Sequence, residues 1–229
     1  INEQSNVVPL ILKNGNIFFA WHSLNQDGSK YGVYAKVINP LTMSEVKGEF
    51  RVNTFVSESQ RNPVLTLLPN GNVLVLWISK TQDGSGNGIY GKILSPNGAT
   101  VVDEFQVNTY TDNEQVRPNA FVLPNDNILI TWESELQDGS DYGIYGTIIT
   151  QTRDIVVPEF RINDYTLYDQ GVLKHLILPN GNIFLAWQSQ GRTGKYIIVG
   201  KIITSDGDTV VSEFQMSDFV LGDNVYVVL

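Results

Sequence analysis

Short apolar and alternating segments separated by turn residues run along the whole chain, and no long amphipathic helix pattern interrupts them. Within residues 61–115, four segments have the length and composition of β-strands. They are residues 63–68, 73–77, 89–94 and 104–108. Asn70-Gly71 lies between the first two segments, and this dipeptide supplies the positive φ angles of a tight hairpin. The pattern therefore predicts four hairpin-linked antiparallel strands.

The second segment of each such group is apolar on both faces. Examples are residues 17–21 (Ile-Phe-Phe-Ala-Trp), 73–77 (Val-Leu-Val-Leu-Trp) and 183–187 (Ile-Phe-Leu-Ala-Trp). A strand without a polar face has to be covered on both sides. Radially packed propeller blades meet this demand, because each sheet lies between two neighbouring sheets.

Three independent markers repeat in phase about every 55 residues. The tryptophans are Trp21, Trp77, Trp132 and Trp187. The Glu-Phe pairs begin at Glu49, Glu104, Glu159 and Glu213. The glutamines are Gln4, Gln60, Gln115 and Gln170. A fixed period of this length is the signature of a repeat architecture.

The repeats therefore predict a single all-β domain over residues 1–229, a β-propeller of four four-stranded blades. The copies are approximately residues 1–60, 61–115, 116–170 and 171–229. A slice of a larger propeller, or a stacked or solenoid β-repeat array, is the alternative. Residues 7–12 and 225–229 both have the pattern of a first strand, and this duplication keeps the alternative open.

Composition narrows the classes of partner. The net charge of −9 and the pI of about 4.6 disfavour binding to nucleic acid or anionic lipid. No cysteine is present, which excludes a disulfide scaffold and thiolate metal ligands. No apolar run approaches the 18 residues of a candidate transmembrane helix. Proteins and neutral sugars stay possible partners.

The unit resembles repeats of secreted bacterial haemolysin-type (RTX-like) or adhesin proteins and of protist, ciliate-like surface proteins. The matching segments are residues 68–72 (Leu-Pro-Asn-Gly-Asn), Trp77, residues 82–91, residues 104–109 and Gln115. The resemblance implies an extracellular or cell-surface location and a scaffold or adhesive role. The calcium-binding nonapeptide Gly-Gly-x-Gly-x-Asp of true RTX repeats is missing, so calcium is allowed but no motif supports it.

A polar loop after the second strand is the first candidate for ligand binding, because loops on a rigid scaffold carry function. Its repeated side chains suit sugar hydroxyls. The candidate ligand-binding residues are Gln26, Asp27, Ser29, Gln82, Asp83, Ser85, Gln137, Asp138 and Ser140. The structural interpretation is favoured, because Asp-Gly is a turn dipeptide and Asp caps its own backbone. The fourth copy keeps the turn glycine at Gly194 and lacks Asp and Ser.

The other repeated side chains are also expected to be structural. The glutamines are expected to bond backbone groups near the neighbouring blade, and the tryptophans to fill the space between blades. His22 and His175 occupy different positions in their copies, and no nucleophile-elbow or phosphate-binding motif appears. The repeated acids look like scaffold, because propeller glycosidases use unlike carboxylates from different blades.

The sequence therefore predicts no catalytic residue and no metal site. The expected function is a non-catalytic structural or adhesive module that binds other protein subunits or surface glycans, with homo-oligomeric or fibrous assembly allowed. A lectin-like propeller is the alternative. A propeller glycosidase or lyase is the least favoured hypothesis.

Overall fold

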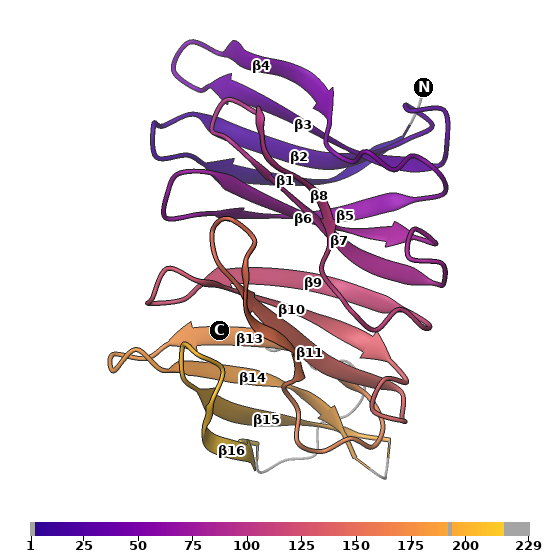
Figure 1. The fold of residues 1–229 in the computed structure, drawn as a ribbon, viewed down its shortest axis with the longest axis vertical. Helices are drawn as coiled ribbons and strands as arrows, with labels where there is room; N and C mark the ends of the chain where they lie inside the picture. Colours follow the sequence, from indigo (N-terminus) through magenta and orange to yellow (C-terminus); the bar gives the residue numbers. More distant parts are fainter. Residues whose placement is uncertain (1–2, 192–193, 218–229) are drawn as a thin grey trace. The chain divides into compact units, whose positions relative to one another are not determined.

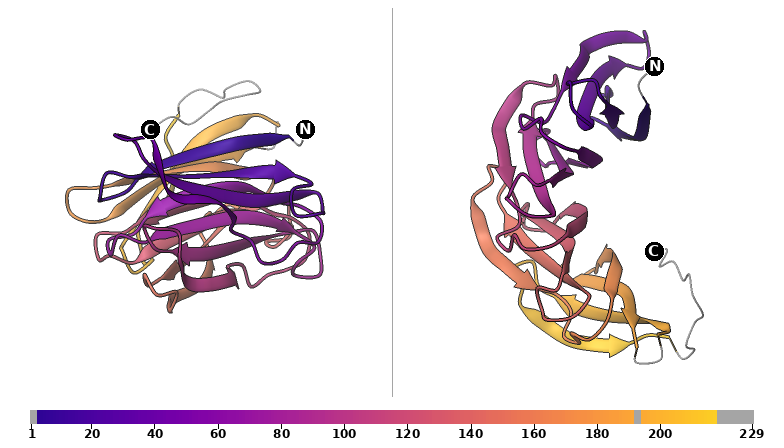
Figure 2. Two further views of the ribbon diagram at one scale, coloured as in Figure 1. Left: turned by 90° about the horizontal axis from the view of Figure 1, so that it is seen from above. Right: turned by 90° about the vertical axis from the view of Figure 1, so that its right-hand side faces the viewer.

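A computed structural model describes residues 3–191 and 194–217, and these residues form sixteen β-strands and no helix (Figures 1 and 2). Each repeat supplies one four-stranded sheet in which consecutive strands are neighbours. The pairings are antiparallel, as hairpin connections require. The predicted all-β propeller of four four-stranded blades is confirmed.

The strands follow the repeat closely. The first sheet contains β1 (Gln4–Ile11), β2 (Ile17–Leu24), β3 (Tyr31–Asn39) and β4 (Ser44–Arg51). The second contains β5 (Gln60–Leu67), β6 (Val73–Lys80), β7 (Asn87–Leu94) and β8 (Thr100–Gln106). The third contains β9 (Gln115–Val122), β10 (Ile128–Glu135), β11 (Tyr142–Ile149) and β12 (Ile155–Arg161). The fourth contains β13 (Gln170–Ile177), β14 (Ile183–Gln190), β15 (Tyr196–Ile203) and β16 (Thr209–Gln215).

The repeated glutamine is the first residue of the first strand in every copy, three residues earlier than predicted in the second copy. The apolar run starts at Pro63, but the pairing of β5 with β6 already begins at Gln60 and continues past a bulge. The expected strand at 225–229 lies outside the described residues.

Tight turns join the strands as predicted. At Asn70-Gly71, Gly71 has φ +88° and donates to the carbonyl of Leu68 over 2.8 Å. Glycine tolerates this left-handed conformation without a Cβ clash. In the third copy Asp126 occupies the same turn position with φ +65°. Aspartate is among the few other residues that adopt it readily.

The chain divides into two compact units, residues 1–122 with 151–153, and residues 123–150 with 154–229. In the first unit, β6 is buried on both faces from Val73 to Ile78. The inward face of β6 and β7 packs against β2 and β3 of the first sheet in one apolar cluster. That cluster contains Leu12, Phe18, Ala20, Val33, Ala35, Val37, Val52, Val73, Val75, Trp77, Tyr90 and Leu94. This packing is the sheet-on-sheet burial that the apolar strands predicted.

In the second unit, Trp132 on β10 and Trp187 on β14 are at most 1% exposed. Trp77 in the first unit is fully buried too, so three of the four tryptophans are core residues, as expected. Trp21 differs. Fully buried and half-buried residues alternate along β2, and Trp21 lies on the half-buried face.

Candidate functional site

The predicted ligand residues of the polar loop bond to one another and to the chain nearby. The carboxylates of Asp27, Asp83 and Asp138 accept the N–H of the serine two residues on, over 3.2, 3.3 and 3.4 Å. The Asx-turn predicted by the structural interpretation is therefore present in all three loops.

The serines and glutamines of these loops reach the rest of their sheet or the connection that follows it. Ser85 Oγ accepts the N–H of Asn113 over 3.2 Å, and Ser140 Oγ accepts that of Tyr168 over 2.8 Å. Ser29 Oγ donates to the carbonyl of Glu58. Gln26, Gln82 and Gln137 each donate to the repeated glutamate, namely Glu49, Glu104 and Glu159.

A glycine at the start of the third strand leaves room for the aspartate. A Cβ on Gly88 would lie 2.4 Å from Asp83 Oδ2, and the distances at Gly32 and Gly143 to their aspartates are 2.5 and 2.7 Å. The structure thus brings the predicted residues together within each copy, but in contacts that build the loop. Ligand binding by them stays a prediction. Among the described residues, no group of three or more His, Asp or Glu side chains has the arrangement of a metal site.

Gln60, Gln115 and Gln170 bond the connection that leads into their own first strand, and the expected bonds to backbone groups of the neighbouring sheet stay a prediction. Gln60 Nε2 donates to the carbonyl of Ser57 in the preceding connection over 2.8 Å, and Gln115 does the same to Asp112. Gln60 Oε1 accepts from Asn53 at the end of the preceding sheet, over 3.3 Å. Gln4 is exposed.

A repeated asparagine that the sequence analysis missed closes the first three sheets, and Ser217 takes its place in the fourth. Asn108 Oδ1 accepts the N–H of Ile89 over 2.7 Å in a buried position. Its Nδ2 lies within hydrogen-bond distance of the carbonyl of Tyr110, Gln115 Oε1 and Asp83 Oδ2. Asn53 and Asn163 make the equivalent bonds to Val33 and Ile144. This asparagine connects the loop, the last strand and the next glutamine.

The first, second and fourth sheets have a β-bulge near the start of their first strand. At this position all four first strands have a residue with a positive φ angle, although none of the four is glycine. These residues are Asn6, Asn62, Arg117 and Val172, with φ of 55°, 56°, 51° and 58°. A β-branched residue in this region is a genuine outlier, and such strain is concentrated at functional sites. Bulges also re-aim side chains next to active sites.

The side chain after each tryptophan breaks the repeat. The four residues at this position are His22, Ile78, Glu133 and Gln188. In the first unit, His22 Nδ1 accepts the N–H of Asn62 over 3.3 Å, and its Nε2 lies 2.9 Å from Ser5 Oγ. Burial lowers the pKa of His22, Arg61 lowers it further, and Glu3 opposes them. His22 is therefore held neutral against the bulge of the next sheet.

In the second unit, Glu133 occupies this position. It is 4% exposed, and its Oε1 accepts the N–H of the strained Val172 over 2.7 Å. A Cβ on Gly171 would lie 2.7 Å from Glu133 Oε1, so glycine leaves the room that the carboxylate occupies. The sequence analysis missed Glu133, because it compared only acids that recur. The signal was available as a column of unlike residues in the aligned copies.

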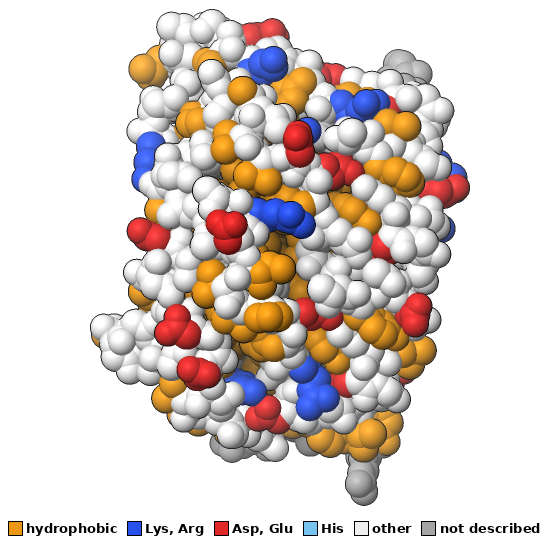
Figure 3. All heavy atoms as spheres, viewed as in Figure 1, with side chains coloured by type: hydrophobic (Ala, Val, Ile, Leu, Met, Phe, Trp, Pro, Cys, Tyr) orange, Lys and Arg blue, Asp and Glu red, His pale blue; other side chains and the backbone are white. Residues whose placement is uncertain are grey.

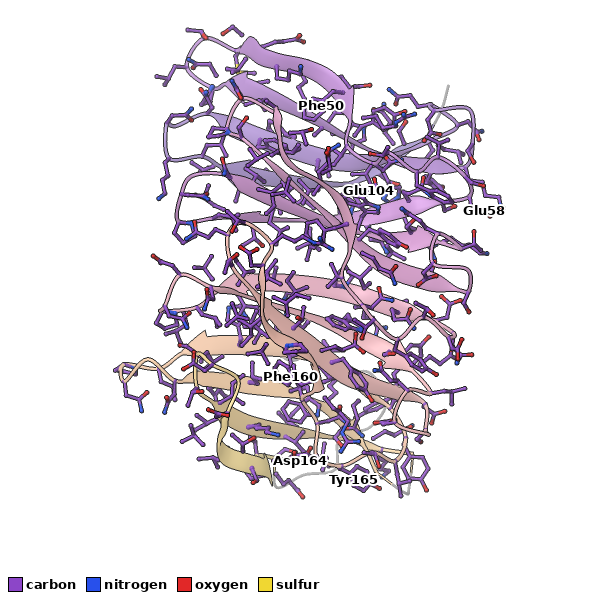
Figure 4. All side chains as sticks on the ribbon, viewed as in Figure 1. Phe50, Glu58, Glu104, Phe160, Asp164 and Tyr165 are labelled. Atoms are coloured by element: carbon purple, nitrogen blue, oxygen red, sulfur yellow. The ribbon has the colours of Figure 1, made fainter. Side chains whose placement is uncertain are left out.

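Charged side chains clip the second sheet to the first and the fourth sheet to the third. In the first unit, Glu104 accepts the N–H groups of Thr54 and Phe55, and Lys92 donates to the carbonyl of Val52 (Figure 4). Charge-assisted bonds to backbone groups are roughly twice as strong as neutral ones. The clip therefore fixes the connection between β4 and β5.

The second unit has the same clip. Glu213 accepts the N–H groups of Asp164 and Tyr165 over 2.8 and 3.1 Å, and Lys201 donates to the carbonyl of Ile162 over 3.1 Å. Figure 4 shows Asp164 beside Tyr165. Burial raises the pKa of Asp164, but the Lys201 ammonium and the Glu213 N–H outweigh it and lower that pKa overall.

The outer surface carries charges of both signs. Figure 3 shows acidic and basic side chains of the described residues interspersed on the viewed face. The described residues also contain no helix with the length and hydrophobicity that membrane crossing requires.

No family model and no curated protein matches the chain. Its fold is similar to that of an α-L-arabinanase from Penicillium chrysogenum complexed with arabinobiose, with a TM-score of 0.66 and 14% identity over 93% of this chain. It is also similar to an α-L-arabinofuranosidase from Fusarium graminearum (TM-score 0.63, 14% identity, 92% of this chain). A protein of unknown function from Dyadobacter fermentans gives a TM-score of 0.63 at 11% identity over 93% of this chain. The chain spans 65–66% of the length of these three proteins.

These structural similarities, at 14% identity or less, show the fold alone. They correct the expected function, because glycoside hydrolases with this fold recur among the similar structures. The prediction of a non-catalytic structural or adhesive module is contradicted, and the lectin alternative is the weaker one. The expectation rested on the repeated loop acids, whose bonds lie within each copy, whereas the unlike side chains His22 and Glu133 contact the start of the next first strand.

Proposed function

We propose that this chain contributes four blades to a glycoside hydrolase that acts on polysaccharides containing arabinose or xylose. The similar structures include enzymes named for arabinan, arabinofuranoside and xylan substrates, from fungi and bacteria. An extracellular location, which the repeat resemblance implies, is compatible with polymeric substrates and is part of the proposal.

The observation that carries the proposal is the buried carboxylate of Glu133 beside a strained bulge. Glycoside hydrolysis uses two carboxyl groups, one that protonates the leaving oxygen and one that acts as base or nucleophile. Glu133 is the unlike acid that such chemistry requires, since the equivalent residues of the other copies are His22, Ile78 and Gln188. We assign Glu133 as one of the two carboxyl groups.

The second carboxyl group is expected immediately before a repeated glutamine, at the start of a first strand. Three copies carry an acid there, Glu3, Glu114 and Asp169, whereas the second copy carries Ser59. In the second unit, Asp169 Oδ2 accepts the Tyr196 hydroxyl over 3.1 Å. Asp169 lies at the same end of its sheet as the residue after the tryptophan, because Gln170 pairs with Ser189.

The test is hydrolysis of arabinan, xylan and an aryl α-L-arabinofuranoside, followed by sugar analysis. Glu133→Gln removes the carboxyl group at nearly constant volume and should lower the rate by about 10²–10⁴-fold. Glu135→Gln, two residues further along β10, is the matched control and should keep the activity. Asp169→Asn, in the same unit as Glu133, then tests the second acid. Absence of hydrolysis of all three substrates, or an active Glu133→Gln variant, would reject the proposal.

A further inference from the structure

The first sheet exposes a face that the other sheets bury. We call this the Trp21 face, made of Ile17, Phe19, Trp21, Lys36 and Ile38 on β2 and β3. All five residues are half-buried, whereas the equivalent Val73, Val75 and Trp77 are fully buried. A groove of about 640 Å³ lies over this face. Its lining includes Val7, which is 63% exposed, and Met43, which is 73% exposed.

The first unit shows what covers such a face. Val73, Val75 and Trp77 pack in one cluster with Phe18, Ala20, Val33, Ala35 and Val37 of the preceding sheet. In this fold, therefore, the tryptophan face of one sheet packs against the opposite face of the preceding sheet. Burial of contiguous apolar surface provides the driving force for this contact.

The polar clips are also ready on the first sheet. Lys36 and Glu49 occupy the positions of Lys92 and Glu104, and both line the groove. With no preceding sheet among the described residues, Lys36 pairs with Glu45 of its own sheet. In both units the equivalent lysine donates to a backbone carbonyl of the preceding sheet, at Val52 and at Ile162.

The fourth sheet carries the matching face. We call this the Phe184 face, made of Phe184, Ala186, Ile198, Gly200 and Ile202 on β14 and β15. These residues are the repeat equivalents of the five first-sheet residues that cover Trp77. Phe184, Ile198 and Ile202 are half-buried, whereas Phe18, Val33 and Val37 are fully buried. Met216, the equivalent of Val52, lies against this face and is 45% exposed.

Gln188 supplies an independent observation. In two other sheets the equivalent side chain accepts the N–H of the next bulge residue, from Asn62 to His22 and from Val172 to Glu133. Gln188 is 8% exposed, and its buried Nε2 has no hydrogen-bond partner among the described residues. A buried amide without a partner costs free energy. The bulge of an incoming first sheet would present the side-chain oxygen of Asn6, an acceptor, to this Nε2 donor.

We propose that the Phe184 face of one copy of this chain binds the Trp21 face of a second copy, so that the chain associates head to tail. In the complex, Lys36 of one copy donates to the Met216 carbonyl of the other, and Gln188 bonds the Asn6 bulge. The two faces differ, so the contact is heterologous and leaves one free face at each end of a dimer. This interaction is independent of hydrolytic activity.

Two variants, each with one blocked face, test the proposal by sedimentation velocity. Phe19→Arg blocks the Trp21 face, and Met216→Arg blocks the Phe184 face. The unaltered chain should form species larger than a monomer whose proportion rises with concentration. Each variant alone should associate at least about 30-fold more weakly, the effect of losing one interface hot spot. A mixture of the two should form a 1:1 complex, because each keeps the face that the other lacks.

Circular dichroism and thermal melting verify that the variants are folded. Should Phe19→Arg fail to fold, Val7→Arg replaces it, because Val7 is more exposed. Leu41→Arg, at a residue that is 93% exposed in the turn after β3, is the control and should associate like the unaltered chain. A monomeric unaltered chain, a mixture without a complex, or association insensitive to both blocking variants would overturn the proposal.

Discussion

The polar loop and the start of the first strand lie at the same end of each sheet, but their side chains differ in how regularly they repeat. In the loop, Asp83 and Ser85 recur in three copies and make the same internal bonds each time. The residue after the tryptophan, which contacts the start of the next first strand, is His22 in one copy and Glu133 in another. Repeated side chains therefore stabilise the sheets, whereas positions at which the copies differ are candidates for a functional role.

The repeated asparagine gives the largest effect expected from breaking the scaffold side of this comparison. Asn108→Ala leaves the buried N–H of Ile89 without its acceptor and removes the donor to Tyr110. We expect a loss of about 3 kcal/mol in the free energy of unfolding, measured by urea denaturation. Asn97→Ala, in an exposed turn, is the control and should stay within about 0.5 kcal/mol of the unaltered chain. Equal stabilities of the two variants would refute a structural role for Asn108.

Substitution of Gly88, at the start of β7, should have the next largest effect on stability. Gly88→Ala places a Cβ where Asp83 Oδ2 lies and should destabilise the fold by about 2 kcal/mol. In the Asp83→Ala background the same change should cost about 1 kcal/mol less, because the atom that clashes is gone. A double-mutant cycle by urea denaturation measures this coupling. Strict additivity would mean that Asp83 does not hold the loop through Gly88.

The scaffold was largely predictable from the sequence. Trp77, Gln60 and the Asn70-Gly71 turn fixed the number of strands, their order and the buried faces, because burial and turn chemistry are local properties that repeat. The asparagine at 53, 108 and 163 recurs in three copies, with Ser217 in the fourth, so this structural position was predictable from the sequence as well.

Other features depend on three-dimensional packing. The positive φ of Val172 results from a bulge that no local propensity favours, and its contact with Glu133 joins two sheets. The half-buried state of Trp21 depends on what covers the first sheet, whereas its sequence context matches that of Trp77. Neither property is encoded in a single repeat.

The bulge of the fourth sheet allows the comparison to be reversed. Val172→Asn introduces the residue that Asn6 and Asn62 already have at this position, and asparagine adopts a positive φ more readily than valine. We expect stabilisation by about 1 kcal/mol, the lower range of the cost of such backbone strain. The reciprocal Asn62→Val should destabilise by a similar amount. If both changes destabilise in urea denaturation, contacts of the Val172 side chain, and not its φ angle, determine the residue there.

The smallest expected effect is the pH dependence that His22 contributes. Its pKa in the folded chain is lowered from 6.5, first by burial and then by Arg61, so below pH 6.5 the unfolded chain binds more protons than the folded one. Stability therefore falls as the pH drops below this value. His175 acts in the same direction, because burial and Lys174 lower its pKa too. In urea denaturation at a series of pH values, His22→Gln should lose less stability on acidification than the unaltered chain, and His22→Gln with His175→Gln less still. An unchanged acid dependence in His22→Gln would contradict the lowered pKa of His22 in the folded chain.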